Sequence, residues 1–310
     1  MVTEYPWISV SGFGAHIKST KKTLIIQKNN TVEEYPIPEV NNLLVIGGHT
    51  LHSSAVMSLI RHGAIISFFE ADGTPVGSIR PPGDQSLRDL YELQETSPRQ
   101  RFATAIAQTS VQARLFCMEQ EEEVRNIRLF YEGELEFLRK SKEELAFLIK
   151  IDEIRRLYRM VSDMYYEIMS RNLPPELGFR RRSIRPHPDP VNAMLSFGYA
   201  LLFGNCTVAS AGARLDPDGG FLHDGKNSLI HDLTDPLKPG MVDTVIFQIA
   251  RETLCGEDYE LTPGRCILSD DLTKVITGRL HSSINTDLIN RQVANLADSI
   301  RTGSGVTVLY

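Results

Sequence analysis

Residues 215–235 read LDPDGGFLHDGKNSLIHDLTD, and the interpretation of the whole chain starts from this stretch. It opens with a tight-turn signature, DPDGG at 216–220, and then presents His223 after an apolar pair. Asp232 and Asp235 follow at a spacing of three residues. If a helix starts at Leu229 with Ser228 as its N-cap, both carboxylates share one face of that helix.

One imidazole beside two carboxylates is a ligand set for a divalent metal ion. Carboxylate oxygens suit Mg²⁺ or Mn²⁺, and a histidine favours Mn²⁺. The alternative interpretation is structural: a surface turn, an aspartate near a helix start where the dipole favours it, and an incidental histidine. Spacing alone leaves both interpretations open.

The composition is that of a soluble globular protein. The chain has 310 residues, 42% hydrophobic and 23% charged, with a formal net charge of −6. The four cysteines form no CxxC pair, which favours free thiols in a reducing cytosol. The polar start MVTEYP indicates no signal peptide, and no apolar run is expected to approach the roughly 18 residues of a membrane span. We therefore expect a cytoplasmic protein without membrane contact.

The hydrophobic pattern divides the chain into two parts. Short apolar runs separated by turn residues predict a small β-rich domain over residues 1–82, interrupted by a helix over 53–62 with Gly63 just after it. A linker is expected over 83–96, after Pro81-Pro82-Gly83. Long helical patterns then run through 97–310. The expected fold class is α+β: a small N-terminal β-rich domain followed by a larger all-helical catalytic domain.

A basic cluster lies between residues 155 and 185, where eight arginines stand against three acidic residues. Such a stripe can neutralise phosphates, and arginine adds bidentate geometry. Alternatively, several of these arginines pair with the acidic helical region upstream. The candidates for DNA contact are the last four: Arg180, Arg181, Arg182 and Arg185.

An apolar helix follows the arginines. Pro190 stands at the first helical position with Asp189 as N-cap, and the pattern continues to Gly212. This helix is too apolar for a surface position, so we expect it at the centre of the second domain.

Three successive motifs now identify a resemblance: DPVNAMLSFGYALL at 189–202, GARLDPDGGFLHDGKNSLIHDLTD at 212–235, and Val242-Asp243. The N-terminal half agrees, with SGFGAHIKSTKKTLIIQKNN at 11–30, LLVIGG at 43–48 and RHGAIISFFEADGTPVG at 61–77. Over residues 8 to 270 the chain resembles the CRISPR-associated DNA integrase family of the spacer-acquisition step.

The resemblance implies an N-terminal β domain, a helical catalytic domain and a Mg²⁺ or Mn²⁺ site. The family's metal ligands are a glutamate, the histidine of GFLH and the last acid of DLxE/D. The latter two match His223 and Asp235 here. Asp232 matches the first acid of that pair, which lies behind the metal or on the DNA side.

The glutamate is where this chain departs from the family. The family pattern is close to Ile-Glu-Gly-x-Ile/Ala-Arg-x-x-Tyr, and aligning Ile154, Arg155 and Tyr158 without a gap places Ile151 at the glutamate position. Glu153 reaches that position only after a two-residue slip, which rotates a helix by roughly 200°. Glu153 is taken as the candidate third ligand, with Asp152 as a further candidate.

The implied chemistry is attack on a phosphodiester, either by a DNA 3′-hydroxyl during integration or by water or a 3′-hydroxyl on a branched substrate. Double-stranded and branched DNA are the expected partners, together with a second copy of the chain and a small ferredoxin-like CRISPR adaptation subunit. The alternative is a family member with an incomplete metal triad that acts mainly as a DNA-binding or scaffold protein. A metal hydrolase of a small substrate is disfavoured because no small-molecule fingerprint is present.

Overall fold

The computed structural model describes residues 5–183, 187–252 and 254–310. The chain forms two compact units. The first, the sheet unit, comprises residues up to Ser97 together with Phe203–Gly219 and Ile289–Gly305. The second, the helical unit, comprises Pro98–Leu202, Gly220–Leu288 and Val306–Tyr310. The stretch expected as a linker, 83–96, contains a helix and belongs to the sheet unit.

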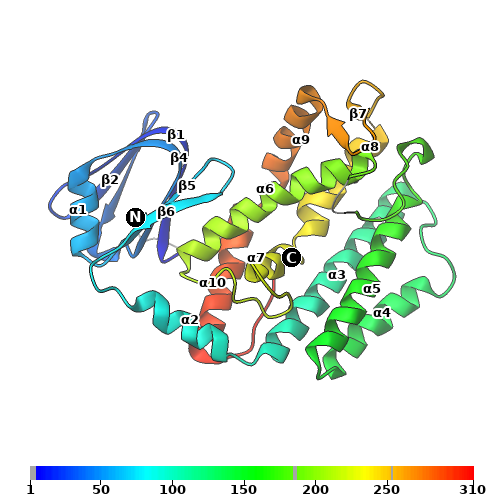
Figure 1. Cartoon of the computed structure of the whole chain (residues 1–310), viewed down its shortest axis with the longest axis horizontal. Helices are drawn as coiled ribbons and strands as arrows, with labels where there is room; N and C mark the ends of the chain where they lie inside the picture. Colours follow the sequence, from blue (N-terminus) through cyan, green and yellow to red (C-terminus); the bar gives the residue numbers. More distant parts are fainter. Residues whose placement is uncertain (1–4, 184–186, 253) are drawn as a thin grey trace. The chain divides into compact units, whose positions relative to one another are not determined.

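The sheet unit contains a six-stranded mixed sheet in the order β3-β2-β1-β4-β5-β6. Strands β1 and β5 each pair parallel with β4, and the other pairings are antiparallel. Figure 1 shows this sheet with the helix α1 beside it. The bounds are β1 Trp7–Ser19, β2 Thr23–Lys28, β3 Thr31–Pro36, β4 Asn42–Leu51, α1 Ser53–Arg61, β5 Ile65–Phe69, β6 Pro75–Ile79 and α2 Ser86–Thr96, with a 3-10 turn η1 at Ile37–Glu39.

The core of the sheet unit lies between the sheet and α1. Ile17, Leu43 and Ile66 on the strands and Leu59 on α1 are fully buried. Helix α1 confirms the helix expected over 53–62, and Gly63 follows its C-cap His62 with φ +87°, a conformation that favours glycine. The β-rich N-terminal region is therefore confirmed.

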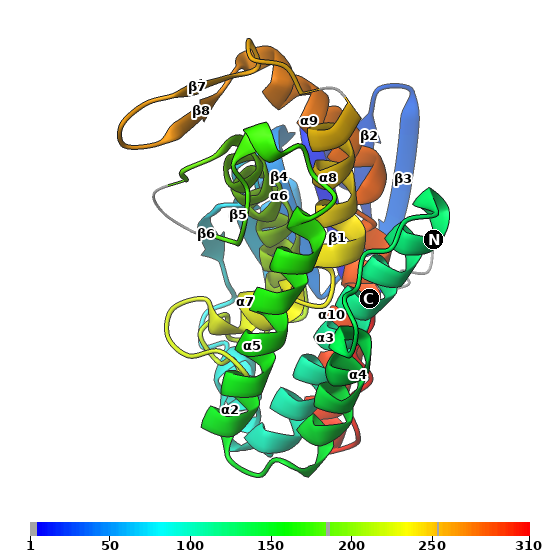
Figure 2. The ribbon, with the colours of Figure 1, turned by 90° about the vertical axis from the view of Figure 1, so that its right-hand side faces the viewer.

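The helical unit is built around three helices that pack side by side (Figures 1 and 2). They are α3 Arg99–Arg125, α4 Glu134–Glu144 and α5 Ile151–Ser170. The remaining helices are α6 Pro190–Gly212, α7 Ser228–Thr234, α8 Thr244–Glu252, α9 Asp270–Ser283 and α10 Thr286–Thr302, with 3-10 turns η2 Leu145–Phe147 and η3 Pro175–Leu177 and a π-helical turn η4 Pro239–Asp243. Helix α10 from Ile289 on and helix α6 from Phe203 on belong to the sheet unit.

This part of the chain is largely rather than entirely helical. Strands β7 Tyr259–Leu261 and β8 Cys266–Leu268 pair antiparallel, and Figure 2 shows their hairpin standing out beside α9. The prediction of an all-helical domain is wrong for these residues. The turn at 262–265 explains the exception. The N–H and the hydroxyl of Thr262 donate to the Arg265 carbonyl, and the Arg265 N–H donates to the Thr262 hydroxyl, which closes the hairpin.

Helix α6 begins as expected, since Asp189 Oδ1 accepts a hydrogen bond from the Asn192 N–H at 2.7 Å. Within the described part of the chain, α6 is the single helix whose length and composition would allow it to cross a membrane. The expectation that no apolar stretch approaches that length is therefore wrong. Half of that stretch is buried within the protein. Its polar side chains are also engaged: Asn192 bonds Asp189, and Tyr199 bonds Asp243. These features are typical of a core helix.

Candidate active site

Asp232 is the residue that shapes the loop before α7. Its carboxylate is buried, with 1% of the side chain exposed. Oδ2 accepts hydrogen bonds from the main-chain N–H groups of Phe221 at 2.6 Å and Leu222 at 3.0 Å, and Oδ1 accepts from that of His223 at 3.0 Å. A buried carboxylate needs such donors to replace lost water. One side chain therefore fixes three consecutive residues of the GFLH turn.

The same carboxylate orients the imidazole of His223. Nδ1 of His223 lies 2.7 Å from Asp232 Oδ1, and because a carboxylate only accepts, Nδ1 carries the proton. The other ring nitrogen, Nε2, lies 3.4 Å from Asp235 Oδ2. Burial lowers the pKa of His223, but the hydrogen bond to Asp232 and the charges of both aspartates outweigh it and leave that pKa raised.

Asp235 lies at the C-terminal end of α7 and is almost fully buried. Its Oδ1 is 2.5 Å from the ammonium of Lys238, and its Oδ2 accepts a hydrogen bond from the hydroxyl of Tyr158. Burial would raise the pKa of Asp235, but the charges of Lys238, His223 and Arg114 outweigh it and hold that pKa well below its usual range. Asp235 is thus an anion wherever the protein is folded near neutral pH.

A buried arginine supports this arrangement from behind. Arg114 of α3 is 2% exposed, and its Nη2 donates to the hydroxyl oxygen of Tyr158 at 3.0 Å while Nη1 donates to the Ser110 carbonyl at 2.9 Å. The hydroxyl of Tyr158 in turn donates a hydrogen bond to Asp235 Oδ2. The chain Arg114–Tyr158–Asp235 therefore joins α3, α5 and α7 in one hydrogen-bonded line.

The loop that carries His223 is also held by two arginines. Arg99 Nε donates to the Phe221 carbonyl at 2.9 Å, and Arg155 Nε donates to the Leu222 carbonyl at 2.5 Å. Both guanidinium groups pair with Asp224. Position 220, where this loop begins, requires a glycine because a Cβ there would lie 2.6 Å from the main chain of Ser228.

A second buried carboxylate, Asp243, lies in the same unit without reaching His223. It accepts hydrogen bonds from Tyr199 at 2.5 Å and Tyr165 at 2.9 Å, and Tyr199 also bonds Tyr166 at 2.7 Å. Burial raises the pKa of Asp243 to about 6, although the two tyrosine hydroxyls oppose that shift. Tyr165 and Tyr166 are core residues, and the hydroxyls of Tyr165 and Tyr199 satisfy this carboxylate.

The raised pKa of Asp243 predicts a pH-dependent stability. Between pH 3.8, the ordinary pKa, and about 6, the unfolded chain releases this proton while the folded protein keeps it, so rising pH favours unfolding. Above about pH 6 this loss of unfolding free energy has reached its full amount, on the order of 3 kcal/mol. In Asp243→Asn, urea unfolding at pH 4, 5, 6 and 7.5 should lack this loss. A difference in unfolding free energy between the two proteins that stays constant over this range would contradict the assignment.

The predicted ligands divide into two groups. His223, Asp232 and Asp235 come together as expected, although α7 begins at Ser228 with Asn227 as its N-cap, one residue earlier than expected. Glu153 is half exposed and lies 3.7 Å from Lys150, and Asp152 is 95% exposed. Within residues 5–183, 187–252 and 254–310, no three His, Cys, Asp or Glu side chains are grouped to hold a metal ion.

The geometry of α5 explains why Glu153 is apart. Arg155 and Tyr158 both reach the site, and Ile151 shares their face at i−4 and i−7. Glu153 lies two residues from both Ile151 and Arg155, which is roughly 200° around the helix. In the ungapped register, Ile151 rather than Glu153 therefore shares the face of α5 that carries Arg155 and Tyr158.

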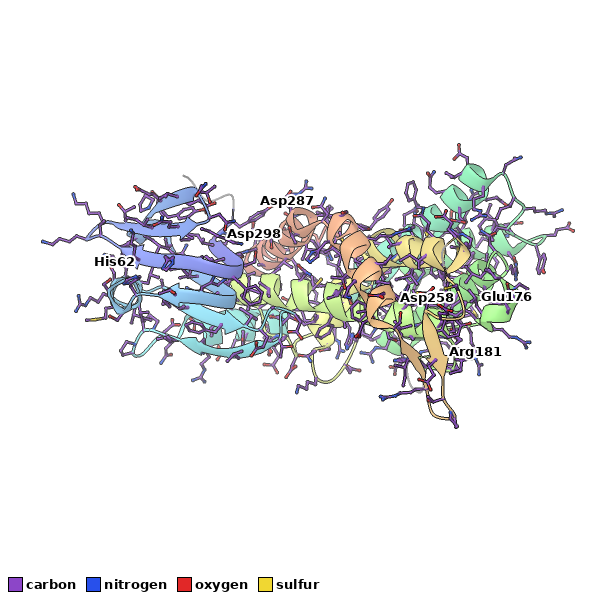
Figure 3. The ribbon with its side chains drawn as sticks, turned by 90° about the horizontal axis from the view of Figure 1, so that it is seen from above. His62, Glu176, Arg181, Asp258, Asp287 and Asp298 are labelled. Carbon is purple, nitrogen blue, oxygen red and sulfur yellow. The ribbon has the colours of Figure 1, made fainter. Side chains whose placement is uncertain are left out.

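The arginine stripe is also divided. Arg171 pairs with Glu134 and Glu167, as the structural alternative expected, and Arg182 bonds Asn192 and Ser196 of α6. Arg180 and Arg181, the latter labelled in Figure 3, are exposed, and no ion pair of either is found among the described residues. Arg185 lies outside the described residues.

Sequence reasoning missed three members of the site: Arg114, Tyr158 as a partner of Asp235, and Lys238. Lys238 follows Asp235 by three residues, a spacing that places an ammonium beside a carboxylate in helical backbone. Tyr158 follows Ile151 and Arg155 on one helix face. Nothing in the local sequence of Arg114 distinguishes it from an exposed helical arginine.

The sequence is similar to CRISPR-associated endonucleases. The family model for CRISPR-associated protein Cas1 matches residues 8–281, and the chain belongs to this family. A Cas1 protein of Methanospirillum hungatei is 39% identical over 293 residues, covering 94% of this chain and 97% of that protein.

Solved structures share the fold. A casposase bound to integration product has a TM-score of 0.82 at 19% identity, covering 96% of both chains. A Cas1 protein of Thermotoga maritima has a TM-score of 0.74 at 19% identity, covering 95% of this chain and 96% of its own. A structure described as a partial Cas6-RT-Cas1–Cas2 complex contains a chain with a TM-score of 0.78 at 19% identity, covering 99% of both.

Proposed function

We propose that this protein is a divalent-metal-dependent DNA endonuclease and integrase of CRISPR spacer acquisition, joining DNA 3′-hydroxyl ends to target DNA and acting on branched DNA. The observation that carries the proposal is the pair of His223 Nε2 and Asp235 Oδ2, 3.4 Å apart and fixed by Asp232, in a Cas1-family chain. Relatives support it: one fold neighbour is a casposase bound to integration product, and another is a Cas1–DNA complex.

The two side chains fit a divalent ion in part. Two donors each about 2.1 Å from one octahedral ion lie about 3 Å apart when they are adjacent ligands, close to the observed spacing. A ligating histidine almost always donates its other N–H to a carboxylate, as His223 does to Asp232. Mg²⁺ is commonly held by one or two carboxylates and keeps several waters. His223 and Asp235 would therefore hold Mg²⁺ or Mn²⁺ with few protein ligands.

When bound, such an ion supplies Lewis-acid polarisation of the scissile phosphate. The residues of the chain then have simple tasks. Asp232 holds the imidazole in one tautomer, and Tyr158 holds the Asp235 carboxylate. Arg180 and Arg181 contact backbone phosphates, which carry no sequence information and suit a substrate recognised by its shape.

One observation favours the runner-up function. Because the described residues contain no group of three metal-binding side chains, the protein could keep the fold and DNA binding of the family while acting mainly as a scaffold. Two assays on the same branched DNA separate the functions: Mn²⁺-dependent cleavage or strand transfer, and binding. DNA binding without any Mn²⁺- or Mg²⁺-dependent reaction would show that the protein acts as a scaffold and would contradict the proposed enzymatic function.

DNA binding should depend on the exposed arginines. In the double variant Arg180→Ala/Arg181→Ala, affinity should fall about equally for unrelated sequences, because phosphate contacts are sequence-independent, and the salt slope should drop by about two. A double variant Lys140→Ala/Lys274→Ala removes the same charge from exposed residues already paired with Glu136 and Asp271, and should bind DNA as the wild type does. Unchanged affinity and salt slope in the arginine variant would remove these residues from the DNA interface.

The proposed partners include a second copy of the chain. The sheet has two edge strands, β3 and β6, and all five residues of β6 are exposed, including Val76 and Ile79. An exposed edge strand carries unpaired main-chain N–H and C=O groups, which can pair with a strand of another chain or be covered by it. Light scattering at micromolar concentration should give twice the 34.8 kDa chain mass; a mass of one chain would exclude the dimer.

We further propose a small ferredoxin-like CRISPR adaptation subunit as partner, since a fold neighbour comes from a Cas1–Cas2 complex. A cytoplasmic location follows from these roles. Mixing the chain with that subunit in size-exclusion chromatography tests the association.

A further inference from the structure

Lys238 is fixed at the candidate metal site by two contacts. Its ammonium lies 2.5 Å from Asp235 Oδ1, and it also lies 5.0 Å from the ring centroid of Tyr199. The side chain is 18% exposed and that of Asp235 is 5% exposed, so little water screens the pair. Tyr199 is itself held by Asp243 and Tyr166. The Lys238 ammonium is therefore held in a defined position beside the Asp235 carboxylate.

Both oxygens of Asp235 are already engaged. Oδ1 has the ammonium of Lys238, and Oδ2 accepts from Tyr158 and faces His223. Arg114 adds a second buried positive charge behind Tyr158. The negative charge that would attract a divalent ion to Asp235 is thus neutralised by the chain's own cations. An incoming ion would meet a like charge within a few ångströms of its ligand.

We propose that Lys238 is the built-in counter-cation of Asp235, and that a divalent ion binds at His223 and Asp235 only by displacing the Lys238 ammonium. The inference rests on the proposed function and adds a determinant of metal affinity to it. Lysine suits the role because its charge is compact and its four-carbon stem is flexible. The ammonium can leave Asp235 by stem rotation, whereas the guanidinium of Arg114 is enclosed.

Mn²⁺ binding to the full-length protein without DNA tests this. Lys238→Met removes the charge and keeps an apolar stem over Tyr199. We expect this variant to bind Mn²⁺ at least about tenfold more tightly than the wild type, because a like charge near the ligand is gone. Its melting temperature without metal should be lower, and Mn²⁺ should raise it by more than in the wild type. Lys238→Gln provides the same measurement if the methionine variant does not fold.

Two controls give the measurement its specificity. Lys226→Met removes the same charge from an exposed lysine of the loop before α7 and should leave Mn²⁺ affinity unchanged. In an Asp235→Asn background, Lys238→Met should have no further effect on Mn²⁺ affinity, since its action depends on that carboxylate.

Equal or weaker Mn²⁺ binding by the Lys238 variants, with the wild type binding measurably, would overturn this inference and leave the proposed function standing. If neither the wild type nor the Lys238 variants bind Mn²⁺ above the level of His223→Ala, the metal site itself fails and the inference fails with it.

Discussion

His223→Ala is expected to abolish Mn²⁺- or Mg²⁺-dependent cleavage and strand transfer on branched DNA, a loss on the order of 10³-fold or more. The imidazole of His223 lies 3.4 Å from Asp235 through Nε2, and Asp232 holds the ring there. The fold should survive, because the side chain is one-third exposed and Asp232 keeps its three main-chain donors. The melting temperature should change by less than about 4 °C.

His281→Ala is the matched control. His281 is an exposed histidine of α9 in the same unit, and its removal should leave the reaction rate unchanged. Metal-dependent product formation by His223→Ala at the wild-type rate would show that the reaction uses other ligands, and the site proposed here would be wrong.

Ile151→Glu is expected to create the third ligand that the described structure does not provide. The residue is the first of α5, on the face that carries Arg155 and Tyr158 into the site. A carboxylate at a helix N-terminus is also favoured by the dipole. Since even outer partners of a metal site change affinity by 10–100-fold, Mn²⁺ affinity should rise by about that factor or more. Titration with Mn²⁺ measures it without reference to activity.

Glu153→Ala separates the two registers of α5. The structure pairs Glu153 with Lys150, so its removal should leave Mn²⁺ affinity and reaction rate unchanged. Loss of both in Glu153→Ala, with no gain in Ile151→Glu, would instead establish the slipped register and Glu153 as the ligand.

Much of the fold could be predicted because local rules agreed with tertiary packing. The helix at 53–62, the cap Asp189 and the strand-rich first eighty residues follow from turn residues and periodicity. The hairpin at 259–268 was not predicted, because two three-residue strands carry too little periodicity. The division of the chain also differs from the expected boundaries, since 203–219 and 289–305 pack with the sheet unit through contacts that no local pattern encodes.

The site was predictable where its residues are close in sequence. His223, Asp232 and Asp235 lie within thirteen residues, and helical spacing brings the two acids to the histidine. Arg114 and Tyr158 reach Asp235 from other helices, so only the three-dimensional structure could reveal them. The assignment of arginines to DNA was limited in the same way: whether Arg182 is a phosphate contact or a partner of α6 depends on a fold that places Asn192 beside it.

The clamp made by Asp232 has a consequence for how this family can vary. Because a single carboxylate holds residues 221–223 from α7, the position of the histidine does not depend on the path of the chain between them. Residues 225 and 226 are exposed, and the loop turns through left-handed backbone at Gly225 and Asn227. Evolution can therefore lengthen or rewrite this short connection without moving the imidazole, whereas a change at Asp232 would remove the partner of His223 Nδ1 and leave the loop to the contacts of Arg99 and Arg155.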